Sequence, residues 1–145
     1  MNNINDFAKS INSVVDFEYI LKDNNYYFIT STQKYFIDAD DRMFPSGFLG
    51  RIKKRFEPSL FLLELLSKNS DNKIFINDTA EFLFLCGRDV FKENITRNNS
   101  NKEIFFVQNK FDENLGFGTF FKQDKQVLVR NIKDRGDFLR REMNK

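Results

Sequence analysis

The stretch that decides the fold is KIFINDTAEFLFLCGRDVFK, residues 73–92. Its opening residues, Lys73–Ile76, are rich in β-branched and aromatic side chains and predict a short strand. Asp78 and the Thr that follows it predict the start of a helix, and Gly87 predicts its end. Val90, Phe91 and Lys92 then predict a second strand. A strand, a helix and a strand within 20 residues indicate one compact supersecondary unit.

Downstream of this unit the sequence predicts more strands and one closing helix. The strands are expected at residues 103–107, 116–121 and 126–129, and the helix at residues 134–141. Several short strands between two helices favour a small, largely antiparallel barrel.

Upstream, the pattern predicts a mixed helical and extended unit. Apolar residues at spacings of three and four predict helices at residues 6–22, 31–42 and 58–68, and an aromatic run predicts a strand at residues 26–30. Gly47 and Gly50 predict a break in regular structure. The polar stretch Ser67–Asn72 then marks a domain boundary. The fold class predicted is α+β, with an N-terminal α/β domain (residues 1–70) before a β-barrel domain (residues 71–145).

Composition excludes most familiar enzyme chemistry. The chain of 145 residues contains no His and a single Cys, so Ser-His-Asp and Cys-His pairs and the common zinc sites are absent. We therefore expect no catalytic residues, no metal, no cofactor and no small-molecule substrate. Cys86 lies in an apolar run and is expected to be buried. The polar N-terminus and the short apolar runs predict no secretory signal and no membrane partner.

Positive charge is concentrated near the C-terminus. The net charge is +2, with 23 Lys and Arg against 21 Asp and Glu. Residues 1–70 are neutral, whereas residues 115–145 carry a net charge of +4. A second basic run, Arg51–Arg55, suggests either an RNA contact or nuclear-localisation-like patch, or an exposed loop balanced by Asp38, Asp40 and Asp41. The exposed loop is the favoured interpretation.

Two stretches resemble a known family. Residues 73–92 resemble the opening of a PUA domain, in the version found in the Nip-seven family of large-subunit ribosome biogenesis factors. The matching positions are Ala80, Glu81, Phe82 or Leu83, Gly87, Val90 and Lys92. Leu115–Gly118 and Asp134–Glu142 are similar to the family's PLGFG and terminal D-x-GEYLRRE motifs, and Asn25–Phe28, Ser46, Gly47 and Gly50 to its upstream motifs. Asn114 and Arg135 depart from the pattern, and the segment between Gly118 and Val127 is shorter.

The resemblance implies a monomeric, non-enzymatic ribosome assembly factor. Its PUA domain would bind pre-rRNA of the pre-ribosomal large subunit, and its first domain would dock other assembly factors during large-subunit biogenesis and pre-rRNA processing. The implied location is the nucleus and nucleolus of a eukaryote, which we favour, or the cytoplasm of an archaeon. Two alternatives remain open: an accessory subunit of an RNA-modification enzyme, and a protein-interaction module that has lost RNA binding.

The resemblance also implies the binding residues. The basic side chains expected to contact RNA are Arg88, Lys92, Lys122, Lys125, Arg130, Lys133, Arg135, Arg140 and Arg141. Gly87, Gly116 and Gly118 are expected to permit close approach, either of RNA or of a neighbouring strand. The favoured interpretation of Gly87 is a helix cap, and that of Gly116 and Gly118 is a bend in the barrel.

Overall fold

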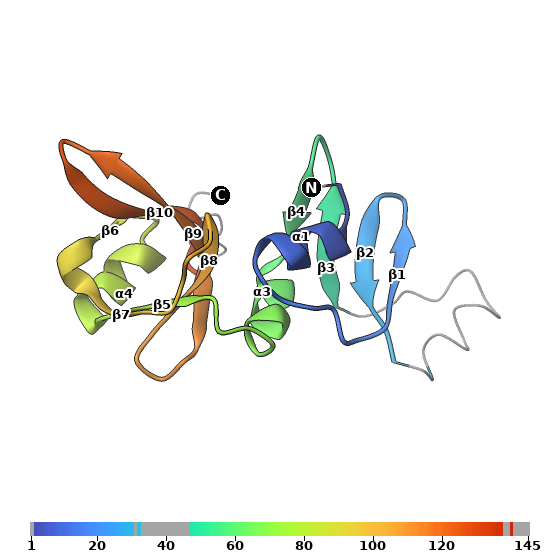
Figure 1. Cartoon of the computed structure of the whole chain (residues 1–145). Helices are drawn as coiled ribbons and strands as arrows, with labels where there is room; N and C mark the ends of the chain where they lie inside the picture. Colours follow the sequence, from blue (N-terminus) through green and yellow to red (C-terminus); the bar gives the residue numbers. More distant parts are fainter. Residues whose placement is uncertain (1, 31, 33–46, 138–139, 141–145) are drawn as a thin grey trace.

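The computed structural model describes residues 2–30, 32, 47–137 and 140, and within them the strands form two sheets (Figure 1). The first sheet has the order β1-β2-β3-β4 and the second the order β6-β10-β9-β8-β5-β7. The strands of the first sheet are β1 (Tyr19–Lys22), β2 (Asn25–Phe28), β3 (Phe48–Ile52) and β4 (Phe56–Pro58). Those of the second are β5 (Lys73–Ile76), β6 (Val90–Phe91), β7 (Ile95–Asn98), β8 (Ile104–Gln108), β9 (Asn114–Gln123) and β10 (Gln126–Asp134). The helices are α1 (Ile4–Ser10), α3 (Leu60–Ser67), α4 (Asp78–Leu85) and the 3₁₀ turn η1 (Lys92–Asn94).

The first predicted helix is too long. α1 ends at Ser10, and β1 occupies the residues that were expected to complete the helix. Asn12 has a φ of 60°, which ends the helix, and Asp23 and Asn24 (φ 53° and 65°) form the tight turn that pairs β1 with β2. Val14, Val15 and Tyr19 therefore do not share a helix face: Val15 and Tyr19 pack against the core, whereas Val14 is exposed. The cap of α1 is Asn3, whose side chain accepts a hydrogen bond from the Asp6 N–H.

Gly50 does not break regular structure as predicted, because it lies within β3 opposite Pro58. A Cβ at Gly50 would come within 2.6 Å of the Phe56 ring, so only glycine fits at this position of the strand. The predicted helix at residues 31–42, apart from residue 32, and residues 138, 139 and 141 of the one at residues 134–141 lie outside the described residues; Asp134 itself ends β10.

The second sheet confirms the predicted strands and adds one. Its strands pair antiparallel except β5 with β8, which are parallel. β9 and β10 are longer than expected and are joined by the turn Asp124-Lys125, where φ is 50° and 70°. β7 and η1 were missed, because Thr96, Arg97 and Asn98 lack the apolar pattern of a strand. The helix over residues 78–85 is confirmed as α4, although its cap is Asn77.

The second sheet is covered on both faces. One face packs on α4 through a core cluster that includes Phe84, Phe105 and Val129. The other face packs on the first half of the chain through Phe106 and Phe117. Neighbouring residues of one strand point to opposite faces, so Phe105 packs in the core with α4 and Phe106 packs in the core with the first half of the chain. The α+β class and the curled, largely antiparallel sheet expected from the sequence are confirmed.

Phe7 joins the two halves of the chain. It projects from α1 and is buried between Phe56 of β4 and Phe117 of β9, with ring centroids 5.7 and 5.6 Å away. Edge-to-face and tilted aromatic pairs at this separation are favourable beyond the area that they bury. Phe7 therefore contacts both sheets within the core cluster that packs them together.

The polar segment between the sheets is a fixed joint. Asn72 is buried, and its amide nitrogen donates to the carbonyl oxygens of Ile11 and Ile104, each at 2.9 Å. Within the first half, the Ser13 hydroxyl donates to the Leu66 carbonyl at 2.7 Å, next to this segment. The strands of the two sheets fall on either side of the predicted boundary at residue 70. The assignment of two domains stays a prediction, but the contacts across the boundary are extensive.

Replacing Phe7 tests this joint. Phe7→Ala should lower the free energy of unfolding by about 3–5 kcal/mol, because it empties a fully buried aromatic site. Denaturant unfolding followed by circular dichroism measures the change. Val14→Ala, at a side chain that is 62% exposed, is the control and should stay within about 0.5 kcal/mol of the unmodified protein. A Phe7→Ala protein as stable as this control would contradict the role given to Phe7.

Candidate nucleic-acid interface

A cleft of about 780 Å³ lies where the two sheets meet. Its apolar lining includes Phe7, Phe56 and Phe117, the same rings that join the halves. Its polar lining carries both signs of charge, with the cations Arg55, Arg130, Lys133 and Arg140 and the anions Glu57, Asp134 and Asp137. The cleft therefore combines a base of buried aromatic rings with cationic groups contributed by both sides.

Arg130 and Arg55 are the exposed cations of the cleft. Arg130 lies on β10, and its guanidinium carbon sits 4.4 Å from the centre of the Phe121 ring. Arg55 lies in the turn between β3 and β4 and belongs to the other sheet. Arg130 was among the predicted RNA contacts. Arg55 was not, because the basic run that contains it was interpreted as a balanced surface loop.

Lys133 and Arg135 cross between the halves of the chain. The Lys133 ammonium donates to the Pro58 carbonyl at 2.9 Å. The Arg135 guanidinium donates to the Asn114 carbonyl and pairs with Glu64 of α3 at 3.2 Å. Both were predicted to contact RNA, and that prediction stays open. What the structure adds is that each already has protein partners.

Arg140 is held by a buried carboxylate. Its two terminal nitrogens donate to the two oxygens of Asp134 at 3.0 Å, and one of them also donates to the Leu85 carbonyl at 2.7 Å. Asp134 is buried and also accepts from the Asn131 amide at 3.0 Å. The hydrogen bonds that Arg140 donates to Asp134 raise the pKa of Arg140 above its ordinary value. The bidentate pair fixes Arg140 as a constant charge beside the loop that follows α4. Arg141 lies outside the described residues.

At each of the three predicted glycines, another part of the protein lies close to the glycine backbone. A Cβ at Gly116, where φ is 148°, would overlap the Lys133 carbonyl, and one at Gly118 would lie 2.6 Å from the Arg130 carbonyl. The segment that approaches both glycines is thus β10, which is the approach of a neighbouring strand; the favoured interpretation, a bend in the barrel, stays a prediction. Gly87, with a φ of 87°, follows the end of α4, and its N–H donates to the Phe84 carbonyl at 2.9 Å. A Cβ there would meet the Arg140 guanidinium at 3.1 Å.

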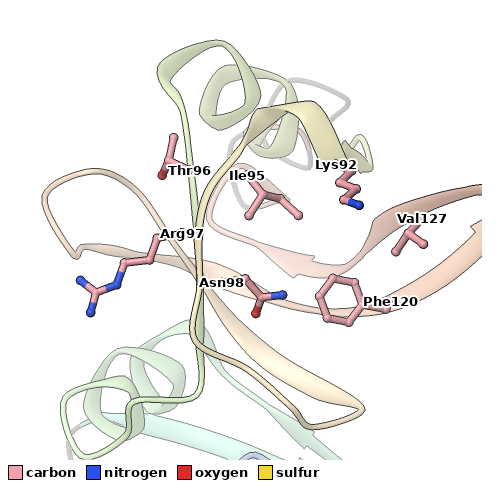
Figure 2. A pocket seen from close by; sticks show the side chains of 7 residues that line it. All are labelled: Lys92, Ile95, Thr96, Arg97, Asn98, Phe120 and Val127. Carbon is pink, nitrogen blue, oxygen red and sulfur yellow. The ribbon is translucent and has the colours of Figure 1, made fainter.

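The remaining predicted cations lie elsewhere on the second half. Arg88 is exposed in the loop after Gly87, and Lys125 is exposed in the turn between β9 and β10. Lys92 lines a second pocket of about 410 Å³, together with Phe120 and Val127 (Figure 2). Lys122 is paired directly opposite Val127 and therefore lies on the same face of the hairpin. Of the predicted cations, the structure thus places Arg130, Lys133 and Arg140 at the cleft and Lys92 at a separate pocket, whereas Arg88, Lys122, Lys125 and Arg135 line neither.

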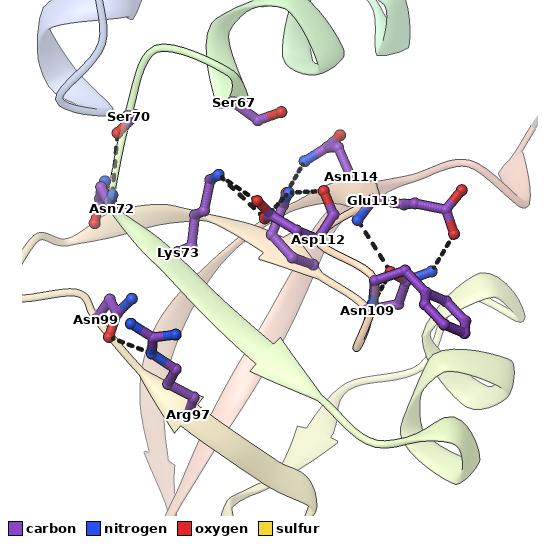
Figure 3. Close-up of polar contacts among 12 residues, drawn as sticks. Ser67, Ser70, Asn72, Lys73, Arg97, Asn99, Asn109, Asp112, Glu113 and Asn114 are labelled. Carbon is purple, nitrogen blue, oxygen red and sulfur yellow. Dashed lines mark hydrogen bonds and ion pairs between the residues drawn. The ribbon is translucent and has the colours of Figure 1, made fainter.

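A network of polar side chains surrounds Asp112 in the second sheet (Figure 3). Asp112 accepts from Gln108 at 3.0 Å and from Lys73 at 3.2 Å. Burial acts to raise the pKa of Asp112, but these hydrogen bonds and the charges of Lys73 and Arg97 outweigh it and lower the pKa below 3.8. The partners of the network come from β5, β7, β8 and the loop between β8 and β9, so it has a structural role.

Among the residues that the structure describes, no group of three or more His, Cys, Asp and Glu side chains is placed to hold a metal ion. No helix there is long and apolar enough to span a membrane. Cys86 was expected to be buried, but it is exposed, because it follows the last turn of α4 on the solvent side.

Known structures show which class of fold this is. The chain is similar to the structure of a conserved PUA domain protein from Thermoplasma acidophilum, with a TM-score of 0.59 and 16% sequence identity, over 95% of this chain and 90% of that one. The fold is therefore that of a PUA-domain protein, and the likeness includes the first half of the chain. PUA domains as a class typically bind RNA.

Sequence comparison refines this class. Residues 72–143 match the family model described as UPF0113 PUA domain, so the second half of the chain is a PUA domain. The chain is 38% identical over 103 residues to a UPF0113 protein of Archaeoglobus fulgidus and 33% identical over 97 residues to one of Aeropyrum pernix. The alignments cover 63% and 64% of this chain. They span 59% and 55% of the relatives, less than two thirds of the length of each.

The assignment to the Nip-seven family is wrong. The matches are to the UPF0113 PUA domain, a family to which the Nip-seven proteins are related, and to archaeal UPF0113 proteins. The motifs around Gly87, Gly116 and Asp134 serve the PUA fold, so they did not separate related families.

A variant at Arg140 tests its structural role. Arg140→Met leaves the buried Asp134 with the Asn131 amide but without its cation, which should lower the free energy of unfolding by about 2–3 kcal/mol. Thermal or denaturant unfolding measures this loss. Arg88→Met removes an exposed cation nearby and should change stability by less than about 0.5 kcal/mol. Equal stability of the two variants would show that the pair with Asp134 is dispensable.

Proposed function

We propose that this protein is a non-enzymatic RNA-binding protein that holds single-stranded RNA in the cleft between its two sheets. The observation that carries the proposal is the placement of Arg55 and Arg130, exposed cations from different sheets, at one cleft lined by aromatic rings. The PUA domain of the second half supports it, since this class typically binds RNA.

The chemistry of the cleft suits a flexible, charged chain. Cations neutralise phosphates and release counterions, which supplies affinity without sequence preference. Phe121 lies under the Arg130 guanidinium, and Phe91, paired opposite Leu128 at the edge of the same sheet, is 50% exposed. Arginine planes and aromatic rings are the surfaces on which unpaired bases stack. Single-stranded RNA is therefore favoured over a duplex, whose bases are already stacked.

The proposal extends to the biological target. We infer that the RNA is pre-rRNA in the pre-ribosomal large subunit and that the first half of the chain docks other assembly factors. In a cell with a nucleus the protein would act in the nucleus and nucleolus, and in an archaeon it would act in the cytoplasm.

Charge reversal at the cleft tests RNA binding. Arg130→Glu should weaken the binding of a single-stranded RNA about tenfold or more, and should reduce the slope of log affinity against log salt by about 0.7 for each lost phosphate contact. Fluorescence anisotropy with a labelled RNA, measured at several salt concentrations, gives both quantities. Arg55→Glu should act in the same direction from the other side of the cleft.

Lys68→Glu provides the matched control. Lys68 is exposed at the end of α3 and is not among the residues that line the cleft, so the same change of charge should leave affinity nearly unaltered. Equal losses in all three variants would assign the effect to net charge alone. Unaltered affinity in both cleft variants would remove the cleft as the RNA site.

A further inference from the structure

The pocket of about 410 Å³ lies on the opposite face of the β9–β10 hairpin from the cleft. Thr119 and Arg130 are paired and line the cleft, whereas the next pair, Phe120 and Val129, points to the other face of the sheet. Figure 2 shows Phe120 and Val127 on one side of the pocket and Ile95 and Lys92 on the other. The proposed cleft cannot include this space, because the sheet separates the two.

One polar group of the pocket has a fixed orientation. The Asn98 side-chain oxygen accepts a hydrogen bond from the Ser100 N–H at 2.9 Å. Because only the amide oxygen can accept this bond, the bond identifies the oxygen and the nitrogen of the Asn98 side chain. The nitrogen points away from Ser100, toward the Phe120 ring in Figure 2. The pocket therefore presents an N–H donor beside an aromatic ring. A ligand that fits must place a hydrogen-bond acceptor on the edge of a flat group.

Positive charge rims the same pocket. Lys92 extends from η1 at its mouth, and Lys122 lies on the same face of the hairpin as Val127. Both lysines are exposed, so they reach solvent above an interior that is mainly apolar. Lysine ammonium groups at such a rim complement phosphate. An apolar slot, a fixed donor and a cationic rim are together the features that one nucleotide requires.

We propose that this pocket binds one unpaired nucleotide of the RNA, apart from the segment that lies in the cleft. The base lies against Phe120, an acceptor on its edge receives the Asn98 amide hydrogen, and the flanking phosphates meet Lys92 and Lys122. The volume falls in the range of about 300–1,000 Å³ that is common for small-ligand sites. The inference rests on the proposed function in one respect, that the protein binds RNA at all.

Two RNAs that differ only in their bases test the proposal. One is a short single-stranded RNA of mixed sequence, and the other has the same backbone with abasic nucleotides throughout. For the unmodified protein, the ratio of the two affinities measures how much the bases contribute. In Asn98→Asp the retained oxygen can still accept from Ser100, but the donor becomes a negatively charged acceptor. This ratio should fall by about tenfold, the scale of one stacked and hydrogen-bonded base.

Matched variants separate the pocket from general effects. Asn99→Asp adds the same charge one residue away, where the side chain accepts from Arg97 and does not line the pocket, and it should keep the unmodified ratio. Phe120→Leu removes the ring but retains an apolar side chain in the core cluster of α4, and it should lower the ratio as Asn98→Asp does. Competition by a free nucleoside monophosphate shows whether the pocket takes nucleotides outside an RNA chain.

The outcomes of the two proposals are distinguishable. Ratios unchanged in both Asn98→Asp and Phe120→Leu, with binding still sensitive to Arg130→Glu, would overturn the nucleotide pocket and leave the cleft. An unmodified protein that binds neither RNA would overturn both. The result expected is a lower ratio of the two affinities in Asn98→Asp and Phe120→Leu, and an unchanged ratio in Asn99→Asp.

Discussion

The rest of the structure depends on the burial of one aromatic side chain, Phe7, between the two sheets. Its ring contacts Phe56 of the first sheet and Phe117 of the second, and both contacts lie at the base of the cleft. The Asn72 amide supports the same joint by binding a carbonyl from each half. Because these groups fix one sheet against the other, Arg55 and Arg130 face a common space. The candidate interface is therefore a consequence of packing as much as of charge.

The basic residues of the second half have two kinds of role. Lys133, Arg135 and Arg140 bind carbonyls and carboxylates of the protein, and in doing so they tie β10 to the first half and to the end of α4. Other basic side chains of the same region, Arg88, Lys92, Lys122, Lys125 and Arg130, are exposed. Some basic residues of the second half thus stabilise the fold, and others are exposed to a polyanion.

Local signals predicted much of the fold, and contacts between distant segments explain the rest. Residues 73–92 predicted β5, α4 and β6 because strand propensity, cap and glycine coincide there. The end of α1 was missed because it depends on the left-handed Asn12. Which arginines are committed to the protein could not be predicted, since Asp134 and Glu64 become partners only in the tertiary structure. The pocket was missed because β7 is polar and Asn98 has no sequence signature.

The most direct test of the account is to map bound RNA on the protein by amide chemical-shift perturbation in NMR. Titration with a single-stranded RNA should shift amides of β9, β10, the loop after α4 and the turn that holds Arg55. Amides of β1 and the exposed face of α3, which lie away from the cleft, should stay in place. Shifts confined to the first sheet, or shifts spread evenly over all exposed lysines, would contradict a cleft built between the two sheets.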